Sequence, residues 1–365
     1  MKNTTLYLIL VITLFASCKK GSNDPTNPTY PPPPAMYFPP ISGSEWQSST
    51  VSSLGWNESQ LAPLYTYLEQ KNSKAFIILS SGKIVAEKYF GTFTADSLWY
   101  WASAGKTVTG MLVGIAQQEG LLNINNKSSQ YLGTGWTSLP LAKENLITVR
   151  HQLTMTTGLD DNVHPDNDCT SPACLVYKAD AGTRWAYHNA PYTMLDKVIE
   201  SATGKNFNTY FQQKIRDVIG MNGTWLKLGF NNVYASSARS MARFGLLLLN
   251  KGKWDQTTIV SDTSYFNAQT NSSQTINPSY GYLTWLNGKD KHMLPSSQIV
   301  FNGSIAPNAP ADMYCALGKN DQKIYVVPSK KIVVIRMGES AENSHLAVSG
   351  FDNELWGKLK LLIGY

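Results

Sequence analysis

Ser103 and Lys106 lie three positions apart in the segment YWASAGK (residues 100–106). On a helix this spacing places both side chains on one face, so the hydroxyl and the amine are expected to be neighbours. At the N-terminus of a buried helix, desolvation and the helix dipole both lower the pKa of a lysine. A neutral lysine can accept the serine proton, which predicts a nucleophile activated without histidine. An ordinary helix start is the alternative, because Ser17–Lys20 and Ser80–Lys83 have the same spacing.

Tyr187 and Asn189 form a second candidate pair further along the chain. If the fold brings Tyr187 close to the serine, its hydroxyl can pass a proton to the leaving group. The amide of Asn189 can hold both the lysine and the substrate. A buried aromatic residue with a satisfied hydroxyl is the alternative for Tyr187. The spacing alone is a weak indication, since Tyr265 and Asn267 repeat it.

Other catalytic signatures are missing from the sequence. The five histidines have no metal-ligand spacing, and there is no Cys-x-x-Cys, Gly-x-Ser-x-Gly or nucleotide-binding glycine loop. We therefore expect no metal ion and no cofactor. With 42% hydrophobic and 15% charged residues, the composition excludes a disordered chain. The net charge of +6 is scattered in runs of at most two residues, so we expect no nucleic-acid partner.

Hydrophobic patterning predicts the elements that must position these residues. Hairpins are expected at 75–90 and 323–336, with a final amphipathic helix over 349–362. Three further helices are expected between them, at 107–118, 191–203 and 236–249. The first of these is apolar almost all round and should be buried. The pattern predicts an α/β fold of the α+β type, with one antiparallel sheet from both chain ends, flanking helices and a helical insertion.

The N-terminus has the pattern of a signal peptide. Lys2 precedes an apolar run at 6–16, which is too short to span a bilayer. The small residues before Cys18 resemble a bacterial lipoprotein cleavage site. This predicts a lipoprotein signal peptide over 1–18 and a lipid on Cys18; an ordinary signal peptide cut near Ser17 is the alternative.

A proline-rich segment follows the predicted anchor. Residues 19–50 contain Pro31–Pro34 and favour an extended, semi-rigid tether. The folded domain is then expected over 51–365. We therefore expect a protein of the bacterial cell envelope that contacts the membrane through its lipid anchor, on the periplasmic or the surface face.

Several segments together resemble the serine β-lactamase-related family, in its class C β-lactamase, DD-peptidase and esterase branch. Ser103–Lys106 matches the Ser-x-x-Lys motif of that family, and Tyr187–Asn189 matches its Tyr-x-Asn. The segment ITVRHQLTMTTGL (147–159) resembles the family sequence between these motifs, and SSARSMARFG (236–245) resembles a later helix. The resemblance covers residues 55–362, nearly the whole expected domain.

This resemblance implies a β-lactamase/transpeptidase-like fold and catalysis through an acyl-enzyme without a cofactor. By it, Ser103 is the acylated nucleophile, and Lys106 and Tyr187 share the general base and acid work. Asn189 and Gly318 belong to the substrate-binding site. The backbone N–H groups of Ser103 and Lys319 would form an oxyanion hole, which lowers a barrier by on the order of 3 kcal/mol. We expect a monomer acting on a small-molecule ester, amide or peptide.

The chain departs from this family in the strand that faces the serine. The family has Lys- or His-Thr-Gly there, whereas YCALGKNDQ (314–322) keeps Gly318 and replaces the polar pair with Ala316 and Leu317. The lost groups bind the carboxylate of a β-lactam or of a peptide C-terminus. This favours an ester or amide hydrolase similar to the aminohexanoate-oligomer hydrolases. In such a hydrolase, the side chain of Lys319 would either replace the lost carboxylate-binding charge or be a solvated loop residue.

Two other activities stay open on the same motifs. A β-lactamase or DD-peptidase is one alternative, and a penicillin-binding or receptor relative that does not turn over is another.

The remaining candidates concern the walls of the site. Cys169 and Cys174 are expected to form a short-loop disulfide, because an exported protein folds in an oxidising compartment. Cys315 is expected to be a buried free thiol, and His188 a packing or substrate-edge residue. Three tryptophans either line an aromatic cleft or pack in the core: Trp101, Trp185 and Trp285.

Overall fold

The computed structural model of the 365-residue chain describes residues 35–165, 167–343 and 345–365. The predicted signal peptide, the lipidation site Cys18 and most of the predicted tether lie outside the described residues. No helix in the described ranges is long and apolar enough to cross a membrane.

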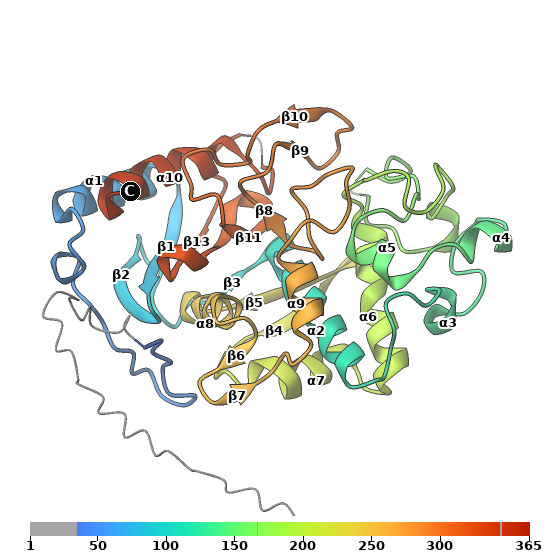
Figure 1. The fold of residues 1–365 in the computed structure, drawn as a ribbon, viewed down its shortest axis with the longest axis horizontal. Coiled ribbons are helices and arrows are strands. Elements are labelled where there is room, and N and C mark those ends of the chain that lie inside the picture. The colour runs from blue at the N-terminus through green and yellow to red at the C-terminus, as the bar shows by residue number, and fades with distance from the viewer. Residues whose placement is uncertain (1–34, 166, 344) are drawn as a thin grey trace, which may run out of the picture. The chain divides into compact units, whose positions relative to one another are not determined.

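Six strands form the main sheet, in the order β2-β1-β13-β12-β11-β8, and all neighbouring pairs are antiparallel (Figure 1). Their bounds are Ser73–Ser80 (β1), Lys83–Tyr89 (β2), Trp285–Leu286 (β8), Tyr314–Gly318 (β11), Gln322–Val327 (β12) and Ile332–Gly338 (β13). β1 pairs with β13, which places Ile77 opposite Ile335. The predicted sheet from both chain ends is confirmed, and the two predicted hairpins are β1–β2 and β12–β13.

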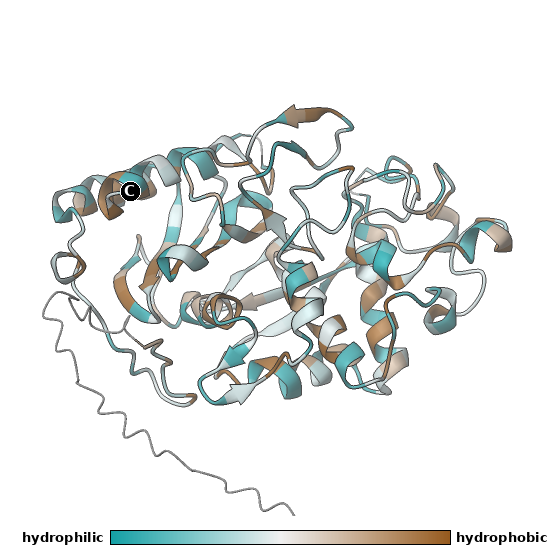
Figure 2. Cartoon of the chain, in the orientation of Figure 1, coloured by the Kyte–Doolittle hydropathy of each residue, from teal (hydrophilic) through white to brown (hydrophobic). Residues whose placement is uncertain are grey.

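Helices cover both faces of this sheet, so β12 and β13 are buried along their whole length. α8 (Ala238–Leu249) packs so closely that a Cβ on Gly245 would lie 2.5 Å from Val333. α1 (Leu61–Gln70) and α10 (Gly350–Ile363) pack together at the other face of the sheet (Figure 1). In Figure 2, α8 is mostly brown, whereas α10 alternates between brown and teal, as expected for a buried and an amphipathic helix.

The region between β2 and β11 contains the helices that carry the candidate residues. α2 (Gly105–Gln118) packs against α6 (Asn189–Thr203), and α2 is buried from Gly105 to Ala116 as predicted. A small sheet in the order β3-β5-β4 contains Trp99–Tyr100 (β3), Asn231–Ser236 (β5) and Thr224–Leu228 (β4). The other helices are Ser129–Leu132 (α3), Leu141–Glu144 (α4), Val149–Leu153 (α5), Phe207–Phe211 (α7) and Thr263–Gln269 (α9). The remaining strands are Lys253–Trp254 (β6), Thr257–Thr258 (β7), Lys291–Met293 (β9) and Val300–Asn302 (β10).

Residues 36–50, which we placed in the tether, pack against the domain. The indole of Trp46 donates to the carbonyl of Gly82 at 2.7 Å, and Arg243 donates to the carbonyl of Pro40 at 2.7 Å. The compact unit accordingly begins at Met36. The apolar side chains of Met36, Phe38 and Trp46 contact the core, which explains why this proline-rich segment is not extended away from it.

Candidate active site

Ser103 lies in a short turn between a strand and a buried helix. The 3₁₀ turn Ala102–Ala104 follows β3 and leads directly into α2. Trp101 fixes the start of this turn, because its backbone N–H donates to the carbonyl of Tyr234 at 2.8 Å. Its indole N–H also donates to the hydroxyl of Ser236 at 2.8 Å. The serine is therefore held by contacts to β5 on one side and by the rigid helix on the other.

The amine of Lys106 lies 3.0 Å from Ser103 Oγ. The lysine is only 4% exposed, and this burial lowers its pKa to about 7, against an opposing attraction from Asp196. Its Nζ also sits 4.1 Å from the centroid of the Tyr192 ring. A large fraction of the lysine is therefore neutral near pH 7, and the Ser103–Lys106 distance suits proton transfer from the hydroxyl to the amine.

Tyr187 contacts the same serine. Its hydroxyl is hydrogen-bonded with Ser103, and burial raises the pKa of the phenol above its ordinary value of 10.0. The ring stacks on Trp285 with a centroid distance of 5.8 Å and an interplanar angle of 19°. Trp185 and Tyr280 add edge contacts to this cluster. A phenol held in this way stays protonated at neutral pH and can give a proton to a leaving group.

The three tryptophans proposed as either cleft or core residues belong to the core. Trp101 and Trp185 are fully buried, and Trp285 is 2% exposed. Trp185 and Trp285 act on the site by fixing the ring of Tyr187, and Trp101 acts by fixing the serine turn.

The edge of β11 completes the wall beside the serine. A Cβ on Gly318 would lie 2.3 Å from the carbonyl oxygen of Trp101 and 3.1 Å from the backbone nitrogen of Ala104. Only glycine therefore allows β11 to pass this close to the serine turn. The next residue, Lys319, lines the same cavity as Ser103. Ala316 and Leu317 are each 1% exposed on the strand, so neither offers a polar group to a ligand.

The turn after Lys319 is held by buried charges. Asn320 and Asp321 both have positive φ, at 59° and 60°, a costly conformation for two residues in a row. Arg336 donates to the carbonyl oxygens of both residues at 3.0 Å. The carboxylate of Asp321 forms an ion pair with Lys323 at 3.1 Å. These contacts determine where the backbone N–H of Lys319 lies.

One cavity of about 510 Å³ is lined by Ser103, Lys106, Asn189 and Lys319. Asn189 is the first residue of α6, and its backbone N–H donates to Asn167 Oδ1 at 3.0 Å. Tyr187 is hydrogen-bonded to Ser103, and Gly318 packs on the turn that carries this serine. The structure therefore brings all six candidate residues together: Ser103, Lys106, Tyr187, Asn189, Gly318 and Lys319.

Several residues that line this cavity were not predicted from the sequence: Tyr100, Asp168, Tyr192, Leu228, Asn231 and Asn232. Tyr192 could have been found, because it follows Asn189 by three positions and so shares its helix face. Tyr100 accepts a hydrogen bond from Asn320 at 2.8 Å, which ties the serine segment to the turn after Lys319. The residues of β4 and β5 carried no signal in the sequence.

The histidines near the site are placed away from the proton transfer. His188 is 4% exposed, and burial lowers its pKa to about 4, so it is neutral at pH 7. This agrees with its assignment to packing. His151 forms a capping box with Thr148 at the start of α5. Among the residues that the structure describes, no cluster of three or more His, Cys, Asp or Glu could hold a metal ion.

The cysteines are arranged as the sequence suggested. Cys169 and Cys174 form a disulfide, and Cys315 is a buried free thiol on β11. The disulfide closes the loop 169–174, which directly follows Asp168, one of the residues of the cavity wall. The loop is thereby constrained next to the site.

Replacing Gly318 with alanine is expected to damage both stability and turnover. The added Cβ would overlap the Trp101 carbonyl, so β11 and the serine turn must separate, at a cost of about 1–3 kcal/mol in the free energy of unfolding. A displacement of even ~1 Å can lower a rate about 100-fold. Urea denaturation and ester hydrolysis would measure the two effects. Gly357→Ala on α10 is the control, because its Cβ meets only the amide of Asn308 at 3.2 Å. Wild-type turnover in Gly318→Ala would contradict this account of the strand edge.

Comparison with known proteins agrees with this geometry. The Beta-lactamase family model matches residues 68–349 of the chain. An uncharacterized protein of Alkalihalophilus pseudofirmus is 24% identical over 312 residues, which cover 75% of this chain and 85% of that protein. A teichoic acid D-alanine hydrolase of Staphylococcus aureus is 26% identical over 155 residues, which cover 40% of this chain and 39% of that protein. The chain thus spans less than half the length of this second relative.

A solved structure from Bacillus anthracis shows the same fold. That protein is provisionally named a 6-aminohexanoate-dimer hydrolase, and it superimposes with a TM-score of 0.67 at 17% sequence identity. The match covers 89% of this chain and 88% of the other. An identity this low shows a shared fold and nothing finer. The match of the family model over most of the folded domain shows more: the chain belongs to the Beta-lactamase family.

Proposed function

We propose that this protein is a serine hydrolase that cleaves an ester or amide through an acyl-enzyme on Ser103. The observation that carries the proposal is the 3.0 Å contact between Ser103 Oγ and the buried amine of Lys106. A lysine whose pKa is lowered to about 7 can act as a general base at neutral pH. Tyr187, protonated and bonded to the same serine, is the group that protonates the leaving alcohol or amine.

The reaction follows from these positions. Lys106 takes the hydroxyl proton while Ser103 Oγ attacks the carbonyl carbon of the substrate. The backbone N–H groups of Ser103 and Lys319 stabilise the negative oxygen of the tetrahedral intermediate. Tyr187 donates a proton as the leaving group departs, which leaves an acyl-enzyme. Tyr187, now a phenolate, then takes a proton from a water molecule that attacks the acyl carbon. The protonated Lys106 returns its proton to Ser103 Oγ as the acyl bond breaks, which releases the acid product and restores all three groups.

Two observations support an ester or amide over a β-lactam. The strand positions that could bind a substrate carboxylate are held by the buried apolar residues Ala316 and Leu317. The Staphylococcus aureus relative is named for the hydrolysis of D-alanine from teichoic acid. A β-lactamase or DD-peptidase is the second candidate, since it would use the same serine, lysine and tyrosine.

The proposal extends to location. The sequence pattern before Cys18 supports export and lipid anchoring, which would place a monomeric hydrolase at the cell envelope with access to external esters and amides. The disulfide of Cys169 and Cys174 supports the same placement, because such bonds persist in oxidising compartments.

A paired substrate assay tests the function. The purified full chain is expected to hydrolyse p-nitrophenyl acetate over many turnovers and nitrocefin at least about 100-fold more slowly, because Ala316 and Leu317 stand where polar groups would receive the carboxylate of the cephalosporin. Absorbance measures both reactions. Efficient nitrocefin turnover would favour the β-lactamase alternative. A single burst of nitrophenol equal to the enzyme concentration, with no further release, would show a binding protein that stays acylated.

A further inference from the structure

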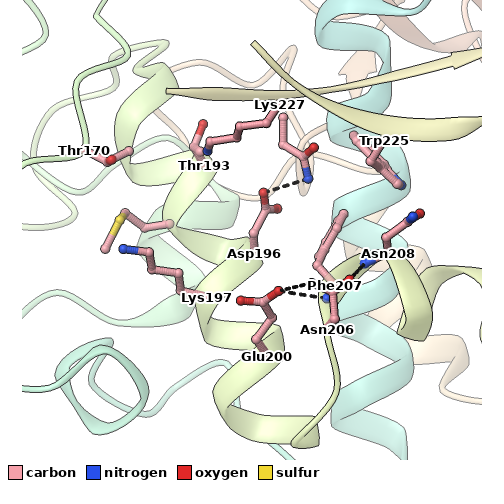
Figure 3. Close-up of a pocket in the computed structure, with 12 residues that line it drawn as sticks. Thr170, Thr193, Asp196, Lys197, Glu200, Asn206, Phe207, Asn208, Trp225 and Lys227 are labelled. Carbon is pink, nitrogen blue, oxygen red and sulfur yellow. Dashed lines mark hydrogen bonds between the residues drawn. The ribbon is translucent and has the colours of Figure 1, made fainter. Parts of the chain in front are cut away.

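A second pocket of about 400 Å³ lies beside the proposed catalytic cavity (Figure 3). One wall is α6, through Thr193, Asp196 and Glu200, and the opposite wall comes from β4 and β5. Asn232 of β5 lines both this pocket and the cavity of Ser103. The two pockets therefore adjoin at Asn232 of the β4–β5 hairpin.

Two hydrogen bonds connect β5 to the segments that face it here. Asn231 donates to Asp168 at 2.7 Å, and Asn232 donates to Asp196 at 3.1 Å. Along α6, Asn189 faces the catalytic cavity and Glu200 faces the second pocket. At 1.5 Å per residue these two positions are about 16 Å apart along the helix axis. A substrate longer than a simple ester could thus extend from the serine into the second pocket, past the Asn232–Asp196 contact.

The second pocket has polar groups that no protein atom satisfies. Thr193 is 5% exposed and lines the pocket, and its hydroxyl has no hydrogen-bond partner among the described residues. Asn208 Oδ1 and Trp225 Nε1, from two other lining residues, also lack a partner in the described part of the chain. Unpaired buried polar atoms are costly, so their gathering around one hollow indicates a ligand that pairs with them.

The charges around this pocket balance. The carboxylates of Asp196 and Glu200 face it, as do the amines of Lys197 and Lys227 (Figure 3). Burial raises the pKa of Asp196 to about 7, so its carboxylate carries a full negative charge only above that pH. Glu200 is already engaged, because it accepts hydrogen bonds from the backbone N–H of Phe207 and from Asn206. Above pH 7 the two carboxylates therefore balance the two amines, and the pocket has no net charge that would select a free cation or anion.

Acceptors, donors and an aromatic wall therefore remain as the means of recognition. Carboxylate oxygens and amide groups can pair with neighbouring hydroxyls, and the rings of Phe207 and Trp225 offer an apolar surface to carbon-bound hydrogens. A ligand with several hydroxyl groups on a carbon skeleton meets all of these features at once.

We propose that the second pocket is a binding site for a neutral polyhydroxylated group, a sugar ring or an open-chain polyol. It serves as a distal subsite for substrates whose scissile bond lies at Ser103. The binding site stands on the pocket itself, whereas its role as a substrate subsite rests on the proposed function.

The binding step is tested in the full chain carrying Ser103→Ala, so that no turnover is needed. Methyl α-D-glucoside and sorbitol are titrated separately while NMR follows the indole N–H of Trp225, assigned with Trp225→Phe. Millimolar saturation by either probe is expected, and comparing the two distinguishes a ring from an open chain. Adding Thr193→Val should weaken binding about five- to tenfold, because it removes one hydroxyl with little change of shape. Thr203→Val, on α6 but outside the pocket, is the matched control.

Two results would overturn the binding site. The first is no shift of the Trp225 signal with either probe. The second is saturation by hexylamine with no response to the polyols, which would show a cation site instead.

The subsite role is tested by kinetics with Thr193→Val and an intact serine. The KM for methyl 6-O-acetyl-α-D-glucoside should rise about five- to tenfold with kcat unchanged, while the KM for p-nitrophenyl acetate stays constant. Equal effects on both substrates would overturn the role as a subsite. If polyols bind but no ester is ever turned over, the proposed function fails and the binding site stands.

Discussion

Replacing Ser103 with alanine is expected to abolish covalent labelling by a fluorophosphonate and to lower ester turnover roughly 10⁴- to 10⁶-fold. The hydroxyl is the only group that can form the acyl bond in the proposed reaction, and Lys106 points at it from 3.0 Å. The loss should appear in kcat, since the cavity walls that bind substrate are unchanged. Gel fluorescence after labelling and a nitrophenyl ester assay measure the two effects.

The chain provides its own control for this variant. Ser80 and Lys83 have the same sequence spacing, but they pair across the turn of the β1–β2 hairpin, not at the start of a buried helix. Ser80→Ala should therefore keep full labelling and turnover. Labelling that persists in Ser103→Ala with a folded protein would remove Ser103 as the nucleophile.

Replacing Lys106 with methionine is expected to lower kcat about 10²- to 10⁴-fold, the usual contribution of a general base. Methionine keeps the length of the side chain and removes the amine that takes the serine proton. In the unmodified protein, kcat/KM should rise with pH through about 7, because the base is active when neutral. Lys106→Met should lose this rise. The groups facing Lys106 are Tyr187, Tyr192 and Asp196, and burial raises the pKa of each.

The same variant should be more stable than the unmodified protein. The pKa of Lys106 falls from 10.5 to about 7 on folding, so the unfolded chain binds more protons between these two values. The free energy of unfolding therefore rises with pH across this window, and below pH 7 the full destabilisation is present. Lys106→Met removes it, which should raise stability near pH 7 by on the order of 3 kcal/mol.

Urea denaturation at pH 6 and pH 9 measures this stability difference, which should be larger at pH 6. Lys83→Met at the turn of the β1–β2 hairpin, where the side chain is half-buried, is the control and should change neither stability nor turnover appreciably. A variant of Lys106 that keeps its kcat would refute the base role. One that loses stability at pH 6 would contradict the burial of an uncharged amine.

Local patterns in the sequence determined most of the secondary structure around the site. The helices at 107–118 and 191–203 and the two hairpins were predictable, because apolar periodicity and turn residues act over a few positions. α2 begins at Gly105, two residues before the predicted start at residue 107, directly after the 3₁₀ turn Ala102–Ala104. The boundary near residue 51 failed for a different reason: the proline-rich composition of 36–50 does not reveal that its aromatic residues contact the core.

The sequence alone also identified the residues with the right chemistry, since the Ser-x-x-Lys and Tyr-x-Asn motifs are each contained in a few positions. Only the tertiary structure decided which of the Ser-x-x-Lys pairs has a buried amine, because desolvation depends on segments that pack around it. It likewise decided that Trp101, Trp185 and Trp285 are core residues and that Asn232 of β5 lines both the site and a second pocket. These contacts join residues far apart in the chain, such as Asn232 and Asp196, and packing of whole elements sets them.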